Sequence, residues 1–242
     1  QMKATGEVMA IGSSLEECLL KAARSLEIGV CHLHMPKFDA MAADELLEYV
    51  RSFRDDAVYA IAQLFRLGAS VEAVHEATAI TPLFLEAIRR ITHMEAALAE
   101  RPGDPDALKK AKVMGFSDKF IARLWKRSET EVWTQRRETG IFPAYRMVDT
   151  CHTGAYIPYF YSTYTGENQS VPSGRRKAVV LGAGPIRIGQ GVEFDYSTVH
   201  AVSTIRQAGY EAIIVNNNPE TVSTDYTTAD KLYFEPLTPE DV

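Results

Sequence analysis

The sequence predicts an α + α/β fold, in which an all-helical region is followed by a Rossmann-like βαβ unit. The first observation is a series of short helix signals between residues 44 and 140, with no strand pattern among them. The second is the order of elements after Lys177. The apolar run 178–181, a glycine-rich loop, a helical pattern that ends at Gly209 and the apolar run 210–215 follow one another. Two buried strands joined by a helix form a right-handed crossover in a parallel sheet.

Capping residues and prolines mark where the helices are expected to begin. Glu16 and Glu17 lie three residues after Ser13 and Ser14, so either serine is predicted to cap a first helix through a capping box. The later helices are predicted to start near residues that favour N-caps or precede a proline: Asp55, Ser70, Thr81, Asp104, Ser117 and Ser128. Glycine is expected to end several of these helices, and Gly209 to end the helix of the βαβ unit.

Two basic side chains on the first predicted helix, Lys21 and Arg24, allow two interpretations. They form a solvated helix face, or they contact a further domain. Sequence patterning does not separate a wet face from an interface, so both interpretations stay open.

Four glycines crowd the loop after the first strand of the βαβ unit: Gly182, Gly184, Gly189 and Gly191. Glycine lets a backbone take positive φ and approach a ligand or a neighbouring segment closely. A dinucleotide site is disfavoured, because the spacing is G-x-G-x4-G and Pro185 stands where the fingerprint expects a helix to begin. The second strand also ends in three asparagines rather than in an acid that would hold a ribose. The alternative to a ligand site is a purely structural tight turn. Such a turn accounts for two of the glycines better than for all four.

Longer motifs around this loop resemble a known family. The stretches GAGPIRIGQGVEFDYSTVHA, NNNPETVSTDY and DKLYFEPL closely resemble the start of the second half of carbamoyl phosphate synthetase large subunits. The upstream stretches TGEVMAIG, KAARSLEIG and YRMVDTC resemble the same family in the same order. The resemblance covers essentially the whole chain, and it is loosest over residues 31–117.

The resemblance implies an internal fragment with three parts. Residues 1–23 would be the tail of the first ATP-grasp half, and residues 24–171 a helical oligomerisation domain. Residues 172–242 would be the truncated start of a pre-ATP-grasp α/β domain. The final residues agree with truncation, because Thr238, Pro239 and two acids signal a helix N-terminus whose helix is absent.

By the same resemblance, the parent enzyme is a cytoplasmic ligase that makes carbamoyl phosphate from bicarbonate, ammonia derived from glutamine, and two ATP. It is expected to use ATP with magnesium or manganese, with potassium as a further candidate ion. Its expected partners are a small glutamine-hydrolysing subunit and other large subunits. This fragment itself is expected to bind no cofactor, to contain no catalytic residue and to supply oligomerisation and domain linkage. Whether the parent serves arginine or pyrimidine synthesis stays open.

Two glutamates are the remaining candidate site residues. In the family, residues that match Glu193 and Glu220 have been associated with an internal passage that carries carbamate between two active sites. Carboxylates in such a passage could order water and steer an anion. The structural alternatives are a helix N-terminal acid for Glu193 and a turn acid for Glu220.

The charge of the chain argues against binding to nucleic acids or to anionic membranes, since the net charge is −6. Residues 101–140 nevertheless hold ten Lys or Arg and six Asp or Glu, a local charge of +4. The helix pairs 70–90 and 117–137 also have the lengths of a helix-turn-helix, so a nucleic-acid-binding module fused to a nucleotide-binding α/β unit is the alternative function. The rest of the chain carries −10, from −6 minus +4, and would repel a phosphate backbone. No apolar run reaches the roughly 18 residues of a membrane span.

Cysteine and histidine neighbours suggest a zinc site at first sight. Cys31, His32 and His34 form one group, and Cys151 and His152 form another. Neither group has the C-x2-C or H-x3-H spacing of zinc ligands, so no metal site is expected. The three cysteines, an odd number at scattered positions, indicate reduced thiols rather than a disulfide framework.

Overall fold

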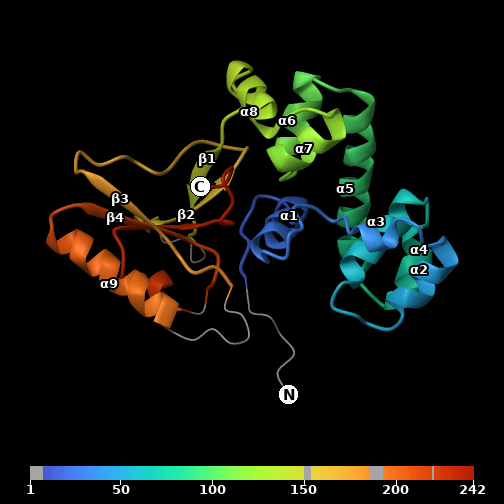
Figure 1. The fold of residues 1–242 in the computed structure, drawn as a ribbon, viewed down its shortest axis with the longest axis horizontal. Coiled ribbons are helices and arrows are strands. Elements are labelled where there is room, and N and C mark those ends of the chain that lie inside the picture. Colours follow the sequence, from blue (N-terminus) through green and yellow to red (C-terminus); the bar gives the residue numbers. More distant parts are fainter. Residues whose placement is uncertain (1–7, 150–153, 186–192, 220) are drawn as a thin grey trace. The chain divides into compact units, whose positions relative to one another are not determined.

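A computed structural model describes residues 8–149, 154–185, 193–219 and 221–242, which divide by their contacts into two compact units (Figure 1). The helical unit consists of Ser14–Ala23 and Gly29–Ile141, and the α/β unit of residues 8–13, Arg24–Ile28 and Phe142–Val242. The boundaries 23/24 and 171/172, which follow from the family resemblance, are a separate division and stay a prediction.

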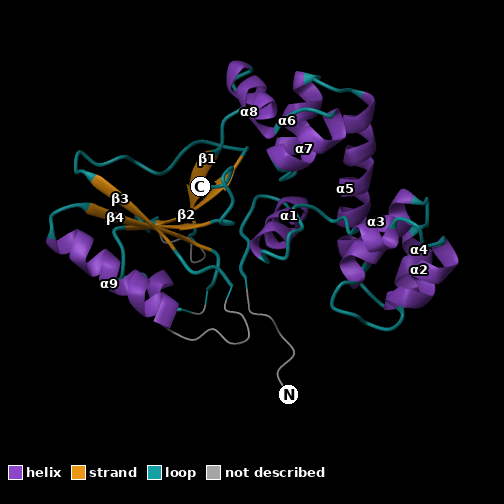
Figure 2. Cartoon of the chain, in the orientation of Figure 1, coloured by secondary structure: helices purple, strands orange, loops and turns teal. Residues whose placement is uncertain are grey.

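The helical unit is built from short α-helices, as expected between residues 44 and 140 (Figure 2). They are α1 (Leu15–Ser25), α2 (Ala43–Val50), α3 (Ala57–Arg66), α4 (Val71–Thr78), α5 (Pro82–Glu100), α6 (Pro105–Val113), α7 (Asp118–Trp125) and α8 (Glu129–Glu138), with a 3-10 turn, η1 (Pro36–Phe38), before α2. The last two residues of α1 group with the α/β unit. Over the described ranges, no helix is long and apolar enough to cross a membrane.

Most of the predicted N-caps are confirmed. The hydroxyls of Ser70, Ser117 and Ser128 each accept a hydrogen bond from a backbone N–H three residues on. Ser128 also forms the predicted box, since its backbone N–H donates to the Glu131 carboxylate at 2.8 Å. The helix predicted to start near Asp55 does so, with Asp56 as the N-cap residue of α3, but the Asp56 side chain makes no cap. Its carboxylate instead accepts a hydrogen bond from the Tyr49 hydroxyl.

The interior of the helical unit contains an ion network. Lys112 and Asp118 are each 1% exposed, and Arg136 is 5% exposed. The Lys112 ammonium donates to Asp118 Oδ1 at 2.9 Å, and the Arg136 guanidinium donates to Asp118 Oδ2 at 3.1 Å. Two of the ten basic residues that suggested a DNA-binding surface are therefore in the core, where they cannot meet a phosphate backbone.

A second buried network involves His32, which the sequence analysis had considered as a metal ligand. Its Nε2 lies 2.8 Å from Glu95 Oε1, and its ring stacks on Phe120 with centroids 3.6 Å apart. Arg66 donates to both oxygens of Glu95 at 2.7 Å and to the carbonyl of Leu33. His32 is thus engaged in joining the segment before α2 to α3, α5 and α7.

Glu95→Gln is expected to lower the free energy of unfolding by about 2 kcal/mol at neutral pH, the size of a hydrogen bond to a charged partner. Burial favours a raised pKa for Glu95, but the hydrogen bonds and charges of His32 and Arg66 outweigh burial and lower this pKa. A depressed folded-state pKa contributes stability above the unfolded pKa, and this contribution is lost as the pH falls through the folded value. The difference between parent and variant should therefore shrink below about pH 4, the usual range of a carboxyl.

Chemical denaturation between pH 3 and 8 measures this difference. Glu86→Gln is the matched control, because Glu86 pairs with Arg89 on the same helix but is far more exposed. A Glu95→Gln difference that stays constant over the whole pH range would contradict the assignment.

The α/β unit contains a mixed five-stranded sheet. Its strands are β1 (Ala144–Met147), β2 (Tyr159–Thr163), β3 (Lys177–Leu181), β4 (Glu211–Asn216) and β5 (Lys231–Phe234), in the order β1-β2-β5-β4-β3. β3 and β4 are parallel and joined through α9 (Glu193–Gln207), which confirms the predicted βαβ unit. The prediction that both strands are buried is wrong for β3, whose residues alternate between exposed and half-buried at the edge of the sheet. β1 is antiparallel to β2, whereas the pairs β2–β5 and β4–β5 are parallel. The polar segment between β2 and β3 connects two strands of this one sheet.

One face of the sheet packs against α9 (Figure 1). Val202 on α9 meets Ala212 and Ile214 on β4 and Leu232 and Phe234 on β5, and all five are buried. Gly209 ends α9 in the left-handed conformation, with φ of 83°, as predicted. This packing holds the carboxyl ends of β3 and β4 together at one edge of the sheet.

Candidate functional site

The candidate site lies at the carboxyl edge of the parallel strands β3 and β4, where open α/β sheets usually bind their ligands. The first half of the glycine loop leaves β3 at this edge. A Cβ atom at position 182 would lie 2.7 Å from both Cβ and Nδ2 of Asn216 and closer still to its Cγ, so only glycine fits there. Gly184 has φ of 69°, and its N–H donates to Asn216 Oδ1 at 3.2 Å. These two glycines let the loop fold directly over the end of β4.

The three asparagines after β4 are almost completely buried. Asn216, Asn217 and Asn218 are 1%, 0% and 3% exposed. Asn216 Oδ1 accepts from the N–H groups of Gly184 and Asn217, and its Nδ2 lies 3.4 Å from Ser223 Oγ. The sequence analysis had placed these residues where a ribose acid is missing and at the start of the NNNPETVSTDY motif. In the structure they form a buried polar layer beneath the glycine loop, at the carboxyl edge of the sheet.

Asp195 holds the segment that contacts this polar layer from the other side. It lies in the first turn of α9, where a negative charge is favoured by the helix dipole. Its two carboxylate oxygens accept from the Ser223 N–H at 3.3 and 3.0 Å. Ser223 belongs to η2 (Val222–Thr224), and Tyr159 on β2 supports η2 by donating to the carbonyl of Thr224 at 2.7 Å. Burial, aided by the charge of Asp225, raises the pKa of Tyr159 to about 12, so this hydroxyl remains a donor.

A segment from far upstream completes the edge. Arg24–Ile28 groups with the α/β unit, and Asn217 Nδ2 lies 3.4 Å from the carbonyl of Ser25. Glu27 has φ of 52°, and its carboxylate lies where a side chain at Gly184 would be. The local sequence carried no signal for this placement, since both residues lie almost 200 positions from β4.

Arg24 holds this segment to the C-terminal residues. Its Nε and NH2 donate to the two carboxylate oxygens of Asp241 at 3.1 and 3.0 Å, with both side chains buried. Burial alone would lower the pKa of Arg24, but the adjacent Asp241 outweighs burial and raises this pKa. Lys21 is also buried, at 3% exposure. A solvated face was therefore the wrong interpretation for both residues.

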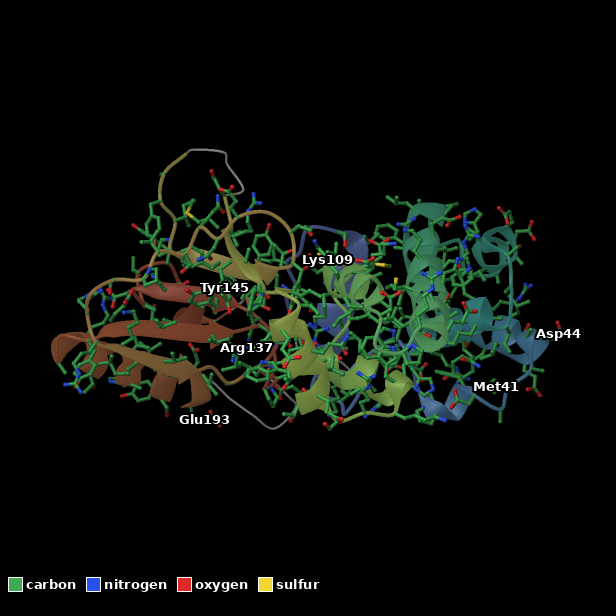
Figure 3. All side chains as sticks on the ribbon, turned by 90° about the horizontal axis from the view of Figure 1, so that it is seen from above. Met41, Asp44, Lys109, Arg137, Tyr145 and Glu193 are labelled. Carbon is green, nitrogen blue, oxygen red and sulfur yellow. The ribbon has the colours of Figure 1, made fainter. Side chains whose placement is uncertain are left out.

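The candidate residues from the sequence fall into two groups. Gly182 and Gly184 are brought together around Asn216. Glu193 is exposed at the start of α9, where its carbonyl accepts from the Ser197 hydroxyl (Figure 3). Gly189, Gly191 and Glu220 lie outside the described residues, as do Cys151 and His152. The passage role of Glu193 and Glu220 thus remains a prediction.

Two family models match the chain. The oligomerisation domain of the carbamoyl-phosphate synthetase large chain matches residues 7–140, more than half of the sequence. The preATP-grasp domain of carbamoyl phosphate synthase matches residues 174–242. The first match contains almost all of the helical unit, and the second contains β3, α9, β4, β5 and most of the candidate site.

Proposed function

Because this chain belongs to the carbamoyl-phosphate synthetase large chain family, we propose that it is a segment of a longer, glutamine-dependent ligase. The parent would make carbamoyl phosphate from bicarbonate, ammonia released from glutamine, and two ATP. The observation that carries this proposal is the order of the two family matches, in which the oligomerisation domain precedes the preATP-grasp domain. In this role the chain supplies self-association and domain linkage rather than the chemical steps.

We assign ATP binding and the magnesium, manganese or potassium ions to other parts of the parent polypeptide. Across the described ranges, no group of three or more His, Cys, Asp or Glu side chains could hold a metal ion. A small glutamine-hydrolysing subunit and a cytoplasmic location belong to the same proposal and rest on the family membership.

We also propose that the carboxyl edge of β3 and β4 borders the route along which carbamate reaches the second active site. Glu193 and Asp195 both lie in the first turn of α9, at this edge. The glycine loop and the buried asparagines supply neutral hydrogen-bonding groups beside these acids. Acids at the border and neutral groups inside would guide an anion without trapping it.

This chain alone is expected to release no ADP above the no-protein background in the presence of ATP, bicarbonate and ammonia. One βαβ unit with its neighbouring strands does not make a complete nucleotide site. A coupled ADP assay measures the rate. Turnover well above background would contradict the assignment of ATP binding to other parts of the parent.

Self-association through the helical unit is the positive expectation. Phe53 is 76% exposed with φ of 47°, and Leu83 and Trp133 are also large exposed apolar residues of this unit. Apolar side chains that remain after the core is filled would pair across a two-fold axis and bury more than about 1,000 Å². At least one of three single substitutions should therefore shift the chain toward monomer: Phe53→Ser, Leu83→Ser or Trp133→Ser. Light scattering over a dilution series measures the mass.

The matched controls are Val179→Ser and Leu181→Ser, at exposed apolar positions on β3. These residues test the rival explanation, in which an exposed apolar face of the sheet causes the chain to self-associate. A chain that is monomeric at high concentration, or one that dissociates only with the β3 variants, would contradict an oligomerisation role for the helical unit.

A further inference from the structure

The helical unit contains a pocket that is lined by residues of α3, α5 and α7. Its volume is about 350 Å³, at the small end of the roughly 300–1,000 Å³ that ligand pockets occupy. Phe65 on α3 and Leu124 on α7 supply large apolar walls, whereas α5 contributes the small side chains of Ala96 and Ala99. These two alanines leave the space between the larger side chains open. The pocket therefore suits a small metabolite with an apolar part.

An ion pair gives this pocket its polar lining. Arg66 and Glu95 both line it, and their side chains stay 19% and 11% exposed. Arg66 donates to the two carboxylate oxygens of Glu95 at 2.7 Å. Burial favours a raised pKa for Glu95, but His32 and Arg66 outweigh burial and lower this pKa, so the carboxylate is charged at neutral pH. The pocket thus presents a positive group directly beside a negative one.

Each member of this pair keeps some hydrogen-bonding capacity. Among the described residues, Arg66 NH1 contacts only Gln63 Oε1, at 3.4 Å, so it retains a donor for a stronger bond. Over the same ranges, Glu95 Oε2 accepts only from Arg66 Nε, and a carboxylate oxygen can accept a second bond. Thr92 Oγ1, which also lines the pocket, donates to the Arg89 carbonyl and can still accept. One charged donor and one charged acceptor are therefore available side by side.

We propose that this pocket binds a free α-amino acid with an apolar side chain. The ligand's carboxylate would accept from Arg66 NH1, and its ammonium would donate to Glu95 Oε2 and Thr92 Oγ1. Its side chain would lie against Phe65 and Leu124. The proposal does not rest on the proposed function, because the pocket lies within the helical unit and shares no residue with the candidate site.

The charge pair selects this class of ligand. Arg66 and Glu95 are in direct contact, so their remaining donor and acceptor positions lie close together. An α-amino acid carries its ammonium and its carboxylate on one carbon, so it can meet both positions at once. A simple anion would be repelled by Glu95, and a simple cation by Arg66. Because both side chains are partly exposed, water screens these charges, and we expect a Kd of about 1 mM.

Two-dimensional ¹H–¹⁵N NMR of the labelled chain tests the pocket with L-leucine as the probe. The signals followed are the backbone amides of Phe65, Arg66, Ala96 and Ala99. Three further compounds are titrated at equal pH and ionic strength: 4-methylpentanoate, which lacks the ammonium, 3-methylbutylamine, which lacks the carboxylate, and glycine, which lacks the apolar side chain. The expected result is a saturable shift with leucine and at least tenfold weaker binding of the other three, the effect of losing one bond to a charged group or the apolar contact. The absence of a saturable shift with leucine, or equal binding of leucine and 4-methylpentanoate, would overturn the proposal.

Two variants separate binding from packing. Ala99→Leu fills the pocket and leaves the ion pair intact, so it should weaken leucine binding by about tenfold or more. Glu100→Leu adds the same side chain at the next position of α5, outside the pocket lining, and should bind leucine as the parent chain does. Glu95→Gln should weaken leucine binding by about tenfold and leave 4-methylpentanoate binding no weaker, because only leucine has an ammonium to lose its partner.

The two variants also protect the test against a failure to fold. If Glu95→Gln unfolds, Ala99→Leu still decides the question, since position 99 is exposed and takes no part in the ion pair. Unchanged leucine binding in Ala99→Leu would contradict the pocket. Equal weakening of leucine and 4-methylpentanoate in a folded Glu95→Gln chain would contradict the role of the charge pair.

Discussion

Asp118→Asn is expected to lower the free energy of unfolding of the helical unit by about 3–5 kcal/mol, the cost of breaking a buried ion network from one side. Asp118 is the carboxylate that Lys112 and Arg136 share in the core. Removing its charge leaves two buried cations that have lost the carboxylate facing them. Burying a charge without a counter-charge costs far more free energy than burying a neutral polar group. The helices around Lys112 and Arg136 should therefore unfold more readily and expose these charges to water.

Tryptophan fluorescence during urea unfolding measures this effect, because both tryptophans of the chain, Trp125 and Trp133, lie in the helical unit. The matched control is Asp106→Asn, at an exposed acid in the first turn of α6, which shares only the favourable helix dipole. It should cost less than about 1 kcal/mol. Equal effects of the two substitutions would contradict the importance of the buried network.

Gly182→Ala is expected to destabilise the carboxyl edge of the sheet by about 2–4 kcal/mol. The added Cβ would overlap the Asn216 side chain, and overpacking of this kind costs roughly 1–3 kcal/mol. Moving Asn216 would also weaken its hydrogen bond from the Gly184 N–H, for about 1 kcal/mol more. The damage should spread to Asn217 and Ser25, because the Asn217 backbone N–H donates to Asn216 Oδ1 and Asn217 Nδ2 lies 3.4 Å from the carbonyl of Ser25.

Hydrogen exchange followed by mass spectrometry locates this effect. Peptides that cover β3, β4 and Arg24–Ile28 should exchange faster in Gly182→Ala, whereas peptides from the helical unit should not change. Gly174→Ala is the control, because a Cβ there meets no atom within 4 Å and its φ is not in the left-handed region. Protection at β4 equal to that of the parent would show that Asn216 can move aside without cost.

Much of the fold was predictable because its signals are local. A capping serine accepts a hydrogen bond from a backbone N–H three residues away. Ser70, Ser117 and Ser128 therefore indicate where their helices begin from only a few neighbouring residues. The βαβ unit was equally readable, because its two strands are continuous apolar runs and its helix ends at a glycine. The family resemblance rested on longer motifs, several of them in or beside the βαβ unit, and is confirmed by the family models.

Strands β1, β2 and β5 were not predicted. They are four or five residues long, and each is stabilised by hydrogen bonds to strands elsewhere in the chain. Strands of this length carry too few residues for a periodic pattern to be distinctive.

The candidate site was only partly predictable. The sequence by itself determined that Gly182 and Gly184 form a tight loop after a strand, since glycine spacing is local. Only the tertiary structure decided that Asn216 fills the space beneath them, that Arg24 pairs with Asp241 across 217 positions, and that Ser25 meets Asn217 across 192. A buried polar side chain must find a partner, but its sequence does not say which. That choice depends on which backbones the packed sheet brings together.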